Sequence, residues 1–244
     1  EVENTGRANN YLEIGFNGHS NVIASGEPVF AFWGLETDGI FQNQPEINEH
    51  QAQPDASPGD IRYVDQDGND LIDENDRIVI GNPNPDIIFG IENRLILKQF
   101  EFSFFFSGVF GQDILNLTRM QTEGLNDWIN QSAIVIDRWR SAGSSAVIHG
   151  TSTGDNNILI SDRFVENGSY LRLKNVSLAY NLPTDFLKRV NIERLKIYIT
   201  GHNLLTFTDY SGYDPETSIM GPLNIDYGAY PNSRYLGGGI SFVF

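Results

Sequence analysis

The second half of the chain alternates apolar and polar side chains with a period of two residues. From Ile87 to Leu97 the odd-numbered positions are mostly apolar, and from Phe100 to Phe110 the even-numbered positions are phenylalanine, or glycine at Gly108. Only Lys98 and Gln99 separate the two runs. Because successive side chains of a strand point to opposite faces of a sheet, this pattern predicts a β-hairpin with one apolar face.

Further runs of apolar and aromatic residues predict more strands on both sides of this hairpin. The predicted strands are Asn10–Asn17, Pro28–Leu35, Tyr170–Tyr180, Leu195–Asn203 and Arg234–Phe244. With the hairpin they make about seven strands. One helix is expected around Trp128–Trp139, inside a segment that is too long for an ordinary hairpin loop.

The connections between the later strands alternate between short and long. Lys98–Gln99 and Asn181–Asn191 are short, whereas Gly111–Asn167 and Leu204–Ser233 are long. Transmembrane β-barrels alternate short periplasmic turns with long outer loops, and they cross the membrane with strands of about 9 to 11 residues. A β-sandwich has no reason to alternate in this way, although alternation of side chains alone fits a soluble sandwich with a phenylalanine-filled core.

We therefore predict an all-β fold: an antiparallel transmembrane β-barrel segment of about seven strands from the C-terminal part of a larger barrel. If the chain terminus is periplasmic, three long loops are extracellular. They cover residues 36–86, 111–167 and 204–233 approximately.

The first of these loops carries the densest group of acidic residues in the chain. Its oxygen-bearing residues fall at positions 1, 3, 5, 7, 9 and 12 of a twelve-residue loop, where position 7 contributes a backbone carbonyl. They are Asp65, Asp67, Asn69, Leu71, Asp73 and Asp76. This spacing is typical of a Ca²⁺ loop, and a cation would neutralise carboxylates that otherwise repel each other.

Two positions depart from the usual Ca²⁺ loop. Position 6, where the chain turns sharply and glycine is usual, is Asp70, and position 12 is Asp76 instead of glutamate. Aspartate tolerates left-handed backbone better than most residues, and the loop resembles those of dockerin modules, which also end in aspartate. We predict bound Ca²⁺ in a structural role. The competing interpretation is a solvated acidic turn without metal.

Composition excludes several other classes of function. The chain has 32 acidic and 16 basic residues, for a net charge of −16, which argues against nucleic-acid binding because phosphate contacts need clustered lysine and arginine. It has no cysteine, so disulfides, thiolate metal sites and a cysteine nucleophile are excluded.

We predict no catalytic and no cofactor-binding residues, and therefore no enzyme. The segment Gly150–Gly154 matches a G-x-S-x-G pattern, but no predicted strand leads into it. The four histidines are scattered without a paired spacing. The last long loop contains four tyrosines that could stack on sugar rings, although packing within the loop is the more common use. They are Tyr210, Tyr213, Tyr227 and Tyr230.

Six segments, in this order, carry a resemblance to a known family. They are FWGLETDGIF, PGDIRYVDQDGNDLIDENDRIVIGNPNPDIIFG, FFFSGVFGQDILN, SYLRLKNVSLAYNLP, LKIYITGHNLLTFTDYSGYDPE and GGGISFVF. Together they cover nearly the whole chain. The sequence resembles the C-terminal part of SusC/RagA-type TonB-dependent outer-membrane transporters.

This resemblance implies a function and a set of partners. Members of the family form barrels of about 22 strands around a plug domain. They act with a SusD-like surface lipoprotein, draw energy through TonB, and import glycans or peptides across the outer membrane of Gram-negative bacteria. The plug, the TonB box and most of the barrel have no counterpart in this sequence, so we expect a piece of a transporter that contacts outer-membrane lipid.

A non-transporting role is the alternative. The chain would then be a barrel client bound to outer-membrane assembly or secretion machinery, or a soluble calcium-binding β adhesion module. Solubility without detergent would distinguish the adhesion module, because barrel segments need detergent.

Overall fold

The computed structural model describes residues 11–126, 128–144, 148–151, 156–187, 192–216 and 221–244. These residues belong to two compact units. The short-strand unit comprises Glu1–Asn84, Asp113–Asn167 and Glu216–Ala229, and the long-strand unit comprises Pro85–Gln112, Gly168–Pro215 and Tyr230–Phe244.

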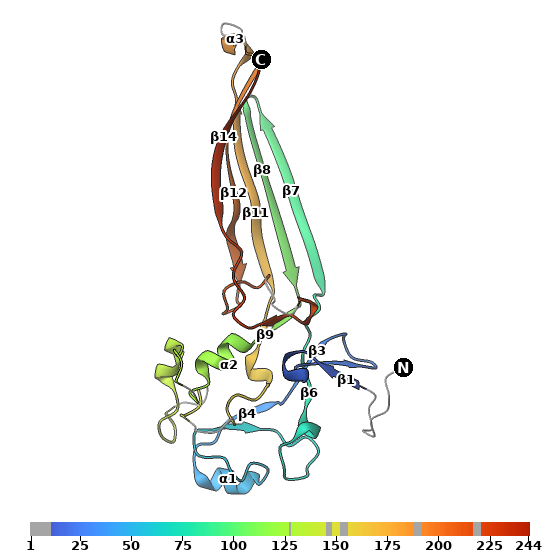
Figure 1. The fold of residues 1–244 in the computed structure, drawn as a ribbon, viewed down its shortest axis with the longest axis vertical. Helices are drawn as coiled ribbons and strands as arrows, with labels where there is room; N and C mark the ends of the chain where they lie inside the picture. Colours follow the sequence, from blue (N-terminus) through green and yellow to red (C-terminus); the bar gives the residue numbers. More distant parts are fainter. Residues whose placement is uncertain (1–10, 127, 145–147, 152–155, 188–191, 217–220) are drawn as a thin grey trace. The chain divides into compact units, whose positions relative to one another are not determined.

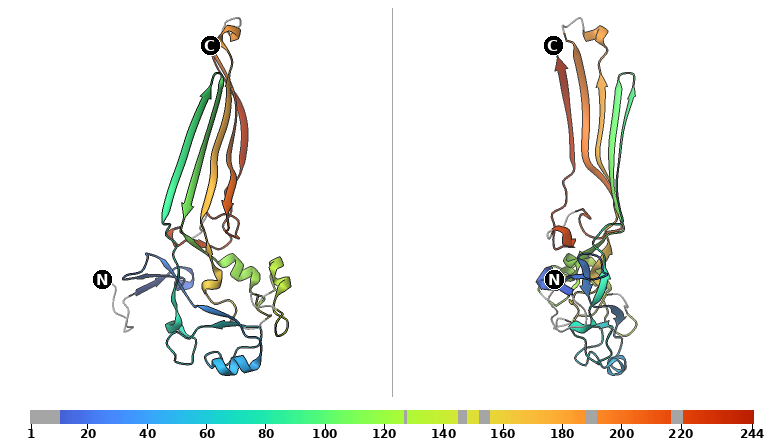
Figure 2. Two further views of the ribbon diagram at one scale, coloured as in Figure 1. Left: turned by 180° about the vertical axis from the view of Figure 1, so that it is seen from behind. Right: turned by 90° about the vertical axis from the view of Figure 1, so that its right-hand side faces the viewer.

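The long-strand unit is one antiparallel sheet of five strands (Figure 1). Across the sheet the order is β14 (Tyr235–Val243), β12 (Arg194–Thr208), β11 (Tyr170–Asn181), β8 (Phe100–Phe110) and β7 (Ile87–Leu97). Figure 2 shows the five strands side by side from behind and the curved sheet on edge. A short helix, α3 (Thr184–Leu187), lies in the connection between β11 and β12.

The register of the sheet sorts side chains into two different faces. One row of paired residues is apolar or aromatic in every strand and consists of Leu97, Phe100, Tyr180, Ile197 and Ile240. A row on the opposite face is polar or small and consists of Arg94, Ser103, Ser177, Thr200 and Gly237. The period-two pattern of the sequence therefore becomes one apolar face and one polar face.

An irregularity in β11 keeps this division intact. The register shifts between Leu173 and Asn175 against both neighbouring strands. Lys174 is an extra residue against β8, whereas two residues of β12, Asn203 and Leu204, lie opposite it. Leu173 pairs with Phe106 and Val176 pairs with Phe104, so both lie on the apolar face although they are three residues apart. After an inserted residue of this kind, the side chains on a given face change from even-numbered to odd-numbered positions or the reverse, while the strand stays paired with the same neighbouring strands.

The two kinds of connection leave opposite ends of the sheet. Leu97 pairs with Phe100 across the tight turn, and Asn181 pairs with Lys196 at the same end. At the other end Tyr170 pairs with both Val109 and Thr208. The long connections all begin or finish at this second end, as the spacing of the predicted strands indicated.

The short-strand unit contains three small sheets. One has the order β1 (Tyr11–Ile14), β2 (Asn21–Ala24), β3 (Ala31–Gly34) and β6 (Ile78–Gly81). Another has the order β10 (Val165–Asn167), β9 (Asp113–Asn116) and β13 (Ile225–Asp226), and the last pairs β4 (Thr37–Ile40) with β5 (Ile61–Tyr63). The helices are α1 (Gln44–His50) and α2 (Leu117–Glu123). Within the described part of the chain, no helix is long and apolar enough to cross a membrane.

Segments far apart in the sequence build the core of the short-strand unit. Its main cluster consists of Phe32, Leu115, Leu117, Phe164 and Ile225, all almost completely buried. Phe32 lies in β3, whereas the other four residues come from the predicted loops 111–167 and 204–233. Parts of two predicted loops therefore pack together with β3.

Two details of the fold differ from the sequence predictions. The long sheet holds five strands, and the two earliest predicted strands form β1 and β3 of the short-strand unit, so the count of seven is unconfirmed. The helix expected around Trp128–Trp139 is present only as a short 3-10 helix at Ala133–Asp137. This helix has three consecutive β-branched residues, no side-chain cap and no buried residue, so nothing stabilises a longer helix there.

Candidate functional site

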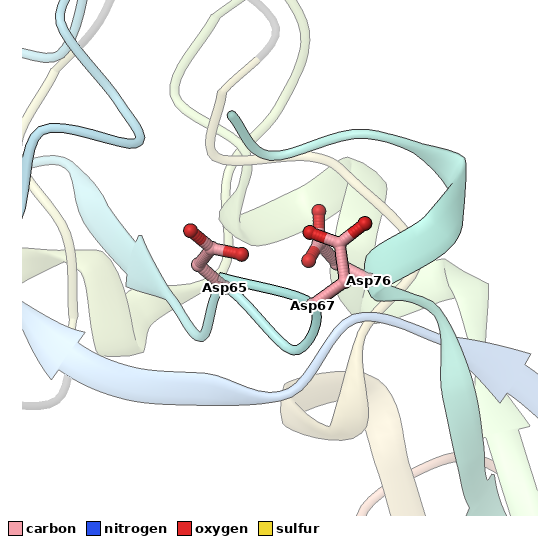
Figure 3. A group of neighbouring side chains, drawn as sticks. All are labelled: Asp65, Asp67 and Asp76. Atoms are coloured by element: carbon pink, nitrogen blue, oxygen red, sulfur yellow. The ribbon is translucent and has the colours of Figure 1, made fainter. Parts of the chain in front are cut away.

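The acidic loop between β5 and β6 brings three carboxylates together. One oxygen each from Asp65, Asp67 and Asp76 lies within 4.8 Å of the others. Figure 3 shows the three side chains around the loop. Three carboxylate oxygens at this spacing are hard ligands that suit Ca²⁺ or Mg²⁺.

Asp65 sets the local conformation of this loop. Its Oδ1 accepts hydrogen bonds from the backbone N–H of Gly68 at 2.7 Å, and its Oδ2 accepts one from Asp70 at 2.8 Å. Gly68 and Asp70 have left-handed backbone, with φ of 71° and 62°. The prediction that aspartate at position 6 can adopt the sharp turn is therefore confirmed.

Asp76 closes the loop from inside the protein. Its side chain is fully buried, and its two oxygens accept backbone N–H bonds from Gln66 and Asp73, each at 2.7 Å. A buried carboxylate is costly unless it is hydrogen-bonded, and these two bonds supply the partners. They also join the start of the loop to its end.

The other predicted ligands make contacts within the loop. The Oδ1 atom of Asn69 accepts a hydrogen bond from the N–H of Leu71 at 2.8 Å. Asp73 accepts a bond from the N–H of Asn75 at 2.6 Å and lies outside the group of three carboxylates. Of the four predicted carboxylate ligands, the structure thus brings three together, and Asn69 donates hydrogen bonds to two of these three carboxylates.

The electrostatics of the loop reflect this crowding. Partial desolvation, followed by repulsion from Asp76, Asp65 and Asp73, raises the pKa of Asp67. Desolvation also acts on Asp65, but hydrogen bonds from the backbone of Asp70, Gly68 and Asn69 outweigh it and lower the pKa of that carboxyl. A bound cation would relieve the repulsion that Asp67 experiences.

The polar face of the long sheet carries charged and hydrogen-bonded residues that were not predicted as site residues. Glu101 pairs with Arg94 at 2.7 Å and with Lys196 at 3.2 Å, which links β7, β8 and β12. A hollow beside this ladder is lined by six polar residues and three apolar ones: Glu92, Ser103, Asn175, Ser177, Thr200 and His202, with Phe104, Phe105 and Val176. The sequence indicated these residues only through the polar positions that alternate along each strand. Which of them face each other depends on the register between the strands, which the sequence pattern does not give.

The four tyrosines of the last loop divide into two kinds. Tyr210 is buried, and the hydroxyl of Tyr227 accepts a hydrogen bond from Gln121 at 2.5 Å. Tyr213 and Tyr230 are exposed, at 75% and 88%. Packing within the protein therefore accounts for two of the four, and two remain free to contact other molecules. Of the G-x-S-x-G match, residues 152–154 lie outside the described part of the chain.

The sequence is similar to several proteins named as TonB-dependent receptors. It is 34% identical over 235 residues to the TonB-dependent receptor P3 of Formosa agariphila. This alignment covers 92% of this chain and 23% of that protein. It is 35% identical over 246 residues to receptor P26 of the same organism, covering 93% and 24%. It is 29% identical to the TonB-dependent receptor SusC of Bacteroides thetaiotaomicron, covering 84% and 20%.

The fold has counterparts among solved structures. A structure of the RagAB peptide importer in an open-open state matches with a TM-score of 0.74 and 22% identity, over 92% of this chain and 23% of that one. A structure of the RagAB peptide transporter matches with a TM-score of 0.74 and 23% identity, covering 96% and 24%. No family profile matches the sequence. The chain spans about a quarter of the length of the curated relatives it matches.

Proposed function

This chain belongs to the TonB-dependent receptors of the SusC family, and from this premise we propose that it supplies wall strands and outer loops to a transporter of the outer membrane. The relatives are named as receptors and importers, which agrees with the expectation of a protein without catalytic activity. The full-length protein would import nutrients, and this chain would contribute its five-stranded sheet to the barrel.

The observation that carries this proposal is the exposed apolar face of the sheet. In the row that crosses all five strands, Leu97 is 72% exposed, Phe100 52% and Ile240 62%. Soluble monomers rarely leave a continuous apolar surface of this extent in contact with water. Lipid satisfies such a face because it removes the apolar area from water, at about 25 cal/mol per Å².

Orientation follows from the two ends of the sheet. The tight turn after Leu97 and the connection after Asn181 suit the periplasmic side, where barrel turns are short. The three long segments, about residues 36–86, 111–167 and 204–233, would then lie outside the cell. Most of their described residues belong to the short-strand unit, whose own core would let it fold as a body in water.

We propose a SusD-like surface lipoprotein and TonB as partners of the full-length protein. The support is kinship with SusC and the shared fold with the RagAB structures, whose names describe a peptide importer or transporter. Glycans and peptides are both retained as substrate classes. The exposed Tyr213 and Tyr230 would offer flat ring faces to either one.

We further propose that the acidic loop binds one Ca²⁺ that orders it, without a part in any chemistry. Asp65, Asp67 and Asp76 would supply the first oxygens. Asn69, the Leu71 carbonyl and Asp73 are the predicted remaining ligands, and they lie in the same twelve-residue loop. Six or more oxygens suit Ca²⁺, whereas Mg²⁺ retains several waters.

The test of the main proposal uses the full-length gene in its native host. Outer-membrane vesicles should contain the protein in detergent-extractable form, and deletion of the gene should abolish growth on either an oligopeptide mixture or a defined glycan as the limiting nutrient. Deletion of the gene for the proposed SusD-like lipoprotein should reduce the same growth. A protein recovered in the soluble fraction without detergent would contradict the proposal and favour the adhesion module.

A further inference from the structure

A buried ion pair in the long-strand unit joins the sheet to its last long loop. Arg172 of β11 donates from its guanidinium to Asp214, which follows β12, and the two side chains are 3% and 4% exposed. Charged side chains are almost never this buried unless they are paired. The sequence places the two residues 42 positions apart, so nothing in the local pattern indicates the contact.

Asp214 holds the two ends of the loop at once. While one carboxylate oxygen accepts from Arg172, the other accepts the backbone N–H of Asn232 at 2.9 Å. Asp214 lies just after the end of β12, and Asn232 lies just before the start of β14. One carboxylate therefore ties the departing and the returning chain to the same point of β11.

Arg172 is itself held in one orientation. Its Nε donates to the hydroxyl of Thr206 on β12 at 2.9 Å, and its guanidinium lies 5.5 Å from the centroid of the Tyr170 ring. A planar fork with several fixed donors can make these contacts together, whereas the ammonium of lysine is a single point charge. The site therefore requires arginine in particular.

The start of the loop is packed as well. The buried Tyr210 ring lies so close to Gly212 that a Cβ there would stand 2.4 Å from it. The Thr208 hydroxyl donates to the carbonyl of Ser169 at 2.8 Å, which joins the end of β12 to the residue preceding β11. These contacts hold one side of the loop base. Asn203 of β12 also donates to the carbonyl of Ser233 at 3.2 Å, and the Asp214 carboxylate joins both sides of the loop base to Arg172.

We propose that Arg172 is a positioning residue: through the Asp214 carboxylate it clamps both ends of the last long loop to the sheet and so fixes how Tyr213 and Tyr230 are presented. Tyr213 adjoins Asp214 in sequence, and Tyr230 lies two residues before Asn232. Both rings project from a backbone that the clamp holds. Loss of the clamp would free the loop base while the sheet, which has its own hydrogen bonds, stays intact.

Chymotrypsin digestion of the purified full-length protein in detergent tests this clamp. Residues 209–233 contain no lysine or arginine, so trypsin cannot report on the loop, whereas chymotrypsin cleaves after tyrosine. Exposed rings alone do not permit cleavage, because a protease needs a locally unfolded stretch of backbone. The bond after Tyr230 is not a usable site, because Pro231 follows it and chymotrypsin does not cleave before proline. We expect Arg172→Gln to raise the cleavage rate after Tyr213 by about tenfold or more.

Matched variants separate the clamp from general damage. Arg94→Gln removes an exposed arginine that pairs with Glu101 on the same sheet, and it should leave loop cleavage unchanged. Arg172→Lys should fall between wild type and Arg172→Gln. The exchange of both charges, Arg172→Asp with Asp214→Arg, should restore part of the protection, since it re-forms the pair but loses the bonds to Thr206 and Asn232.

Global folding is followed by the migration of unheated and heated protein on gels. Equal loop cleavage in wild type and in a correctly folded Arg172→Gln protein would overturn the proposal. If that variant does not fold, Asp214→Asn serves instead, because it keeps the size of the side chain; unchanged cleavage in it would count equally against the clamp. The readout needs no transport, so failure of the proposed import function would leave this result independent.

Discussion

Phe89 of β7 lies against Gly108 of β8, its direct partner across the strand pair. A Cβ at Gly108 would stand 2.5 Å from the Phe89 ring, a distance that side chains do not tolerate. The absence of a side chain also makes room for Phe110, whose ring stacks on Phe89 with centroids 5.7 Å apart. Glycine at this position thus allows two aromatic rings to cover the strand pair.

We therefore expect Gly108→Ala to destabilise the sheet. The added methyl group forces the Phe89 ring away from its position, at a cost of about 1 to 3 kcal/mol. Denaturant unfolding of the full-length protein in detergent measures the loss. Combining the change with Phe89→Leu should recover part of it, because the smaller side chain can move aside, and two additive losses would contradict the proposed contact.

The two faces of β8 should respond differently to charge. Phe104 lies on the apolar face beside Val176, and Ser103 lies on the polar face beside Ser177. If the apolar face contacts lipid, Phe104→Arg should cost about 2 to 4 kcal/mol near the bilayer midplane. Ser103→Arg should cost much less, as measured by refolding into lipid vesicles. Equal costs at the two positions would argue against this assignment of the faces.

The sequence predicted the strands of the long-strand unit well, because the alternation of apolar and polar residues can be recognised within each strand. Alternation from Ile87 to Phe110 sets the faces of the hairpin, and the short Lys98–Gln99 connection sets its register. The extra residue at Lys174 was not predicted, because a bulge only becomes visible once both neighbouring strands are aligned. β12 also extends to Thr208, five residues beyond the strand predicted from alternation, because its pairing with β11 continues past this irregularity.

The core of the short-strand unit was not predicted from the sequence, because it depends on contacts between distant segments. Phe32, Leu115 and Ile225 meet in one core although more than 80 residues separate each from the next. No periodicity links such segments, so the sequence suggested independent loops. In the acidic loop the spacing predicted the turn at Asp70 correctly, but which carboxylates converge depends on the burial of Asp76, and burial is set by the rest of the unit.

A second buried charge network should hold the short-strand unit together. Arg119 of α2 pairs with Glu123 at 2.8 Å and with Glu166 of β10 at 2.8 Å. Burial alone would lower the pKa of this guanidinium, but the two carboxylates outweigh it and raise the pKa, so the arginine stays charged. We expect Arg119→Leu to cost about 3 to 5 kcal/mol, because it leaves the buried Glu123 without its main partner.

Hydrogen exchange of the full-length protein measures this effect locally. Amides of α2 and β10 should lose protection in Arg119→Leu, while amides of β8 and β12 keep theirs. Arg62→Leu is the matched control, since it removes an arginine whose partner Asp38 is 67% exposed. Unchanged protection around α2 would show that the network contributes little to the unit.

Calcium binding by the acidic loop should depend on Asp67 and not on Asp70. Asp67 belongs to the group of converging carboxylates, whereas Asp70 is exposed and serves the loop through its left-handed backbone. Asparagine also tolerates that backbone, so Asp70→Asn keeps the turn and removes one nearby charge. Asp67→Asn removes a proposed ligand charge and should weaken Ca²⁺ binding by tenfold or more, roughly 1.4 kcal/mol.

Isothermal titration of chelator-treated full-length protein in detergent compares the two variants. Asp70→Asn should lower the affinity only slightly, since it contributes negative potential and no ligand. Removal of Ca²⁺ with a chelator should also lower the protection of loop amides from hydrogen exchange, because the metal holds side chains that otherwise repel each other. If wild-type protein takes up no Ca²⁺ at millimolar concentration and neutral pH, the loop is an acidic turn that is held by hydrogen bonds such as those of Asp65 and Asp76.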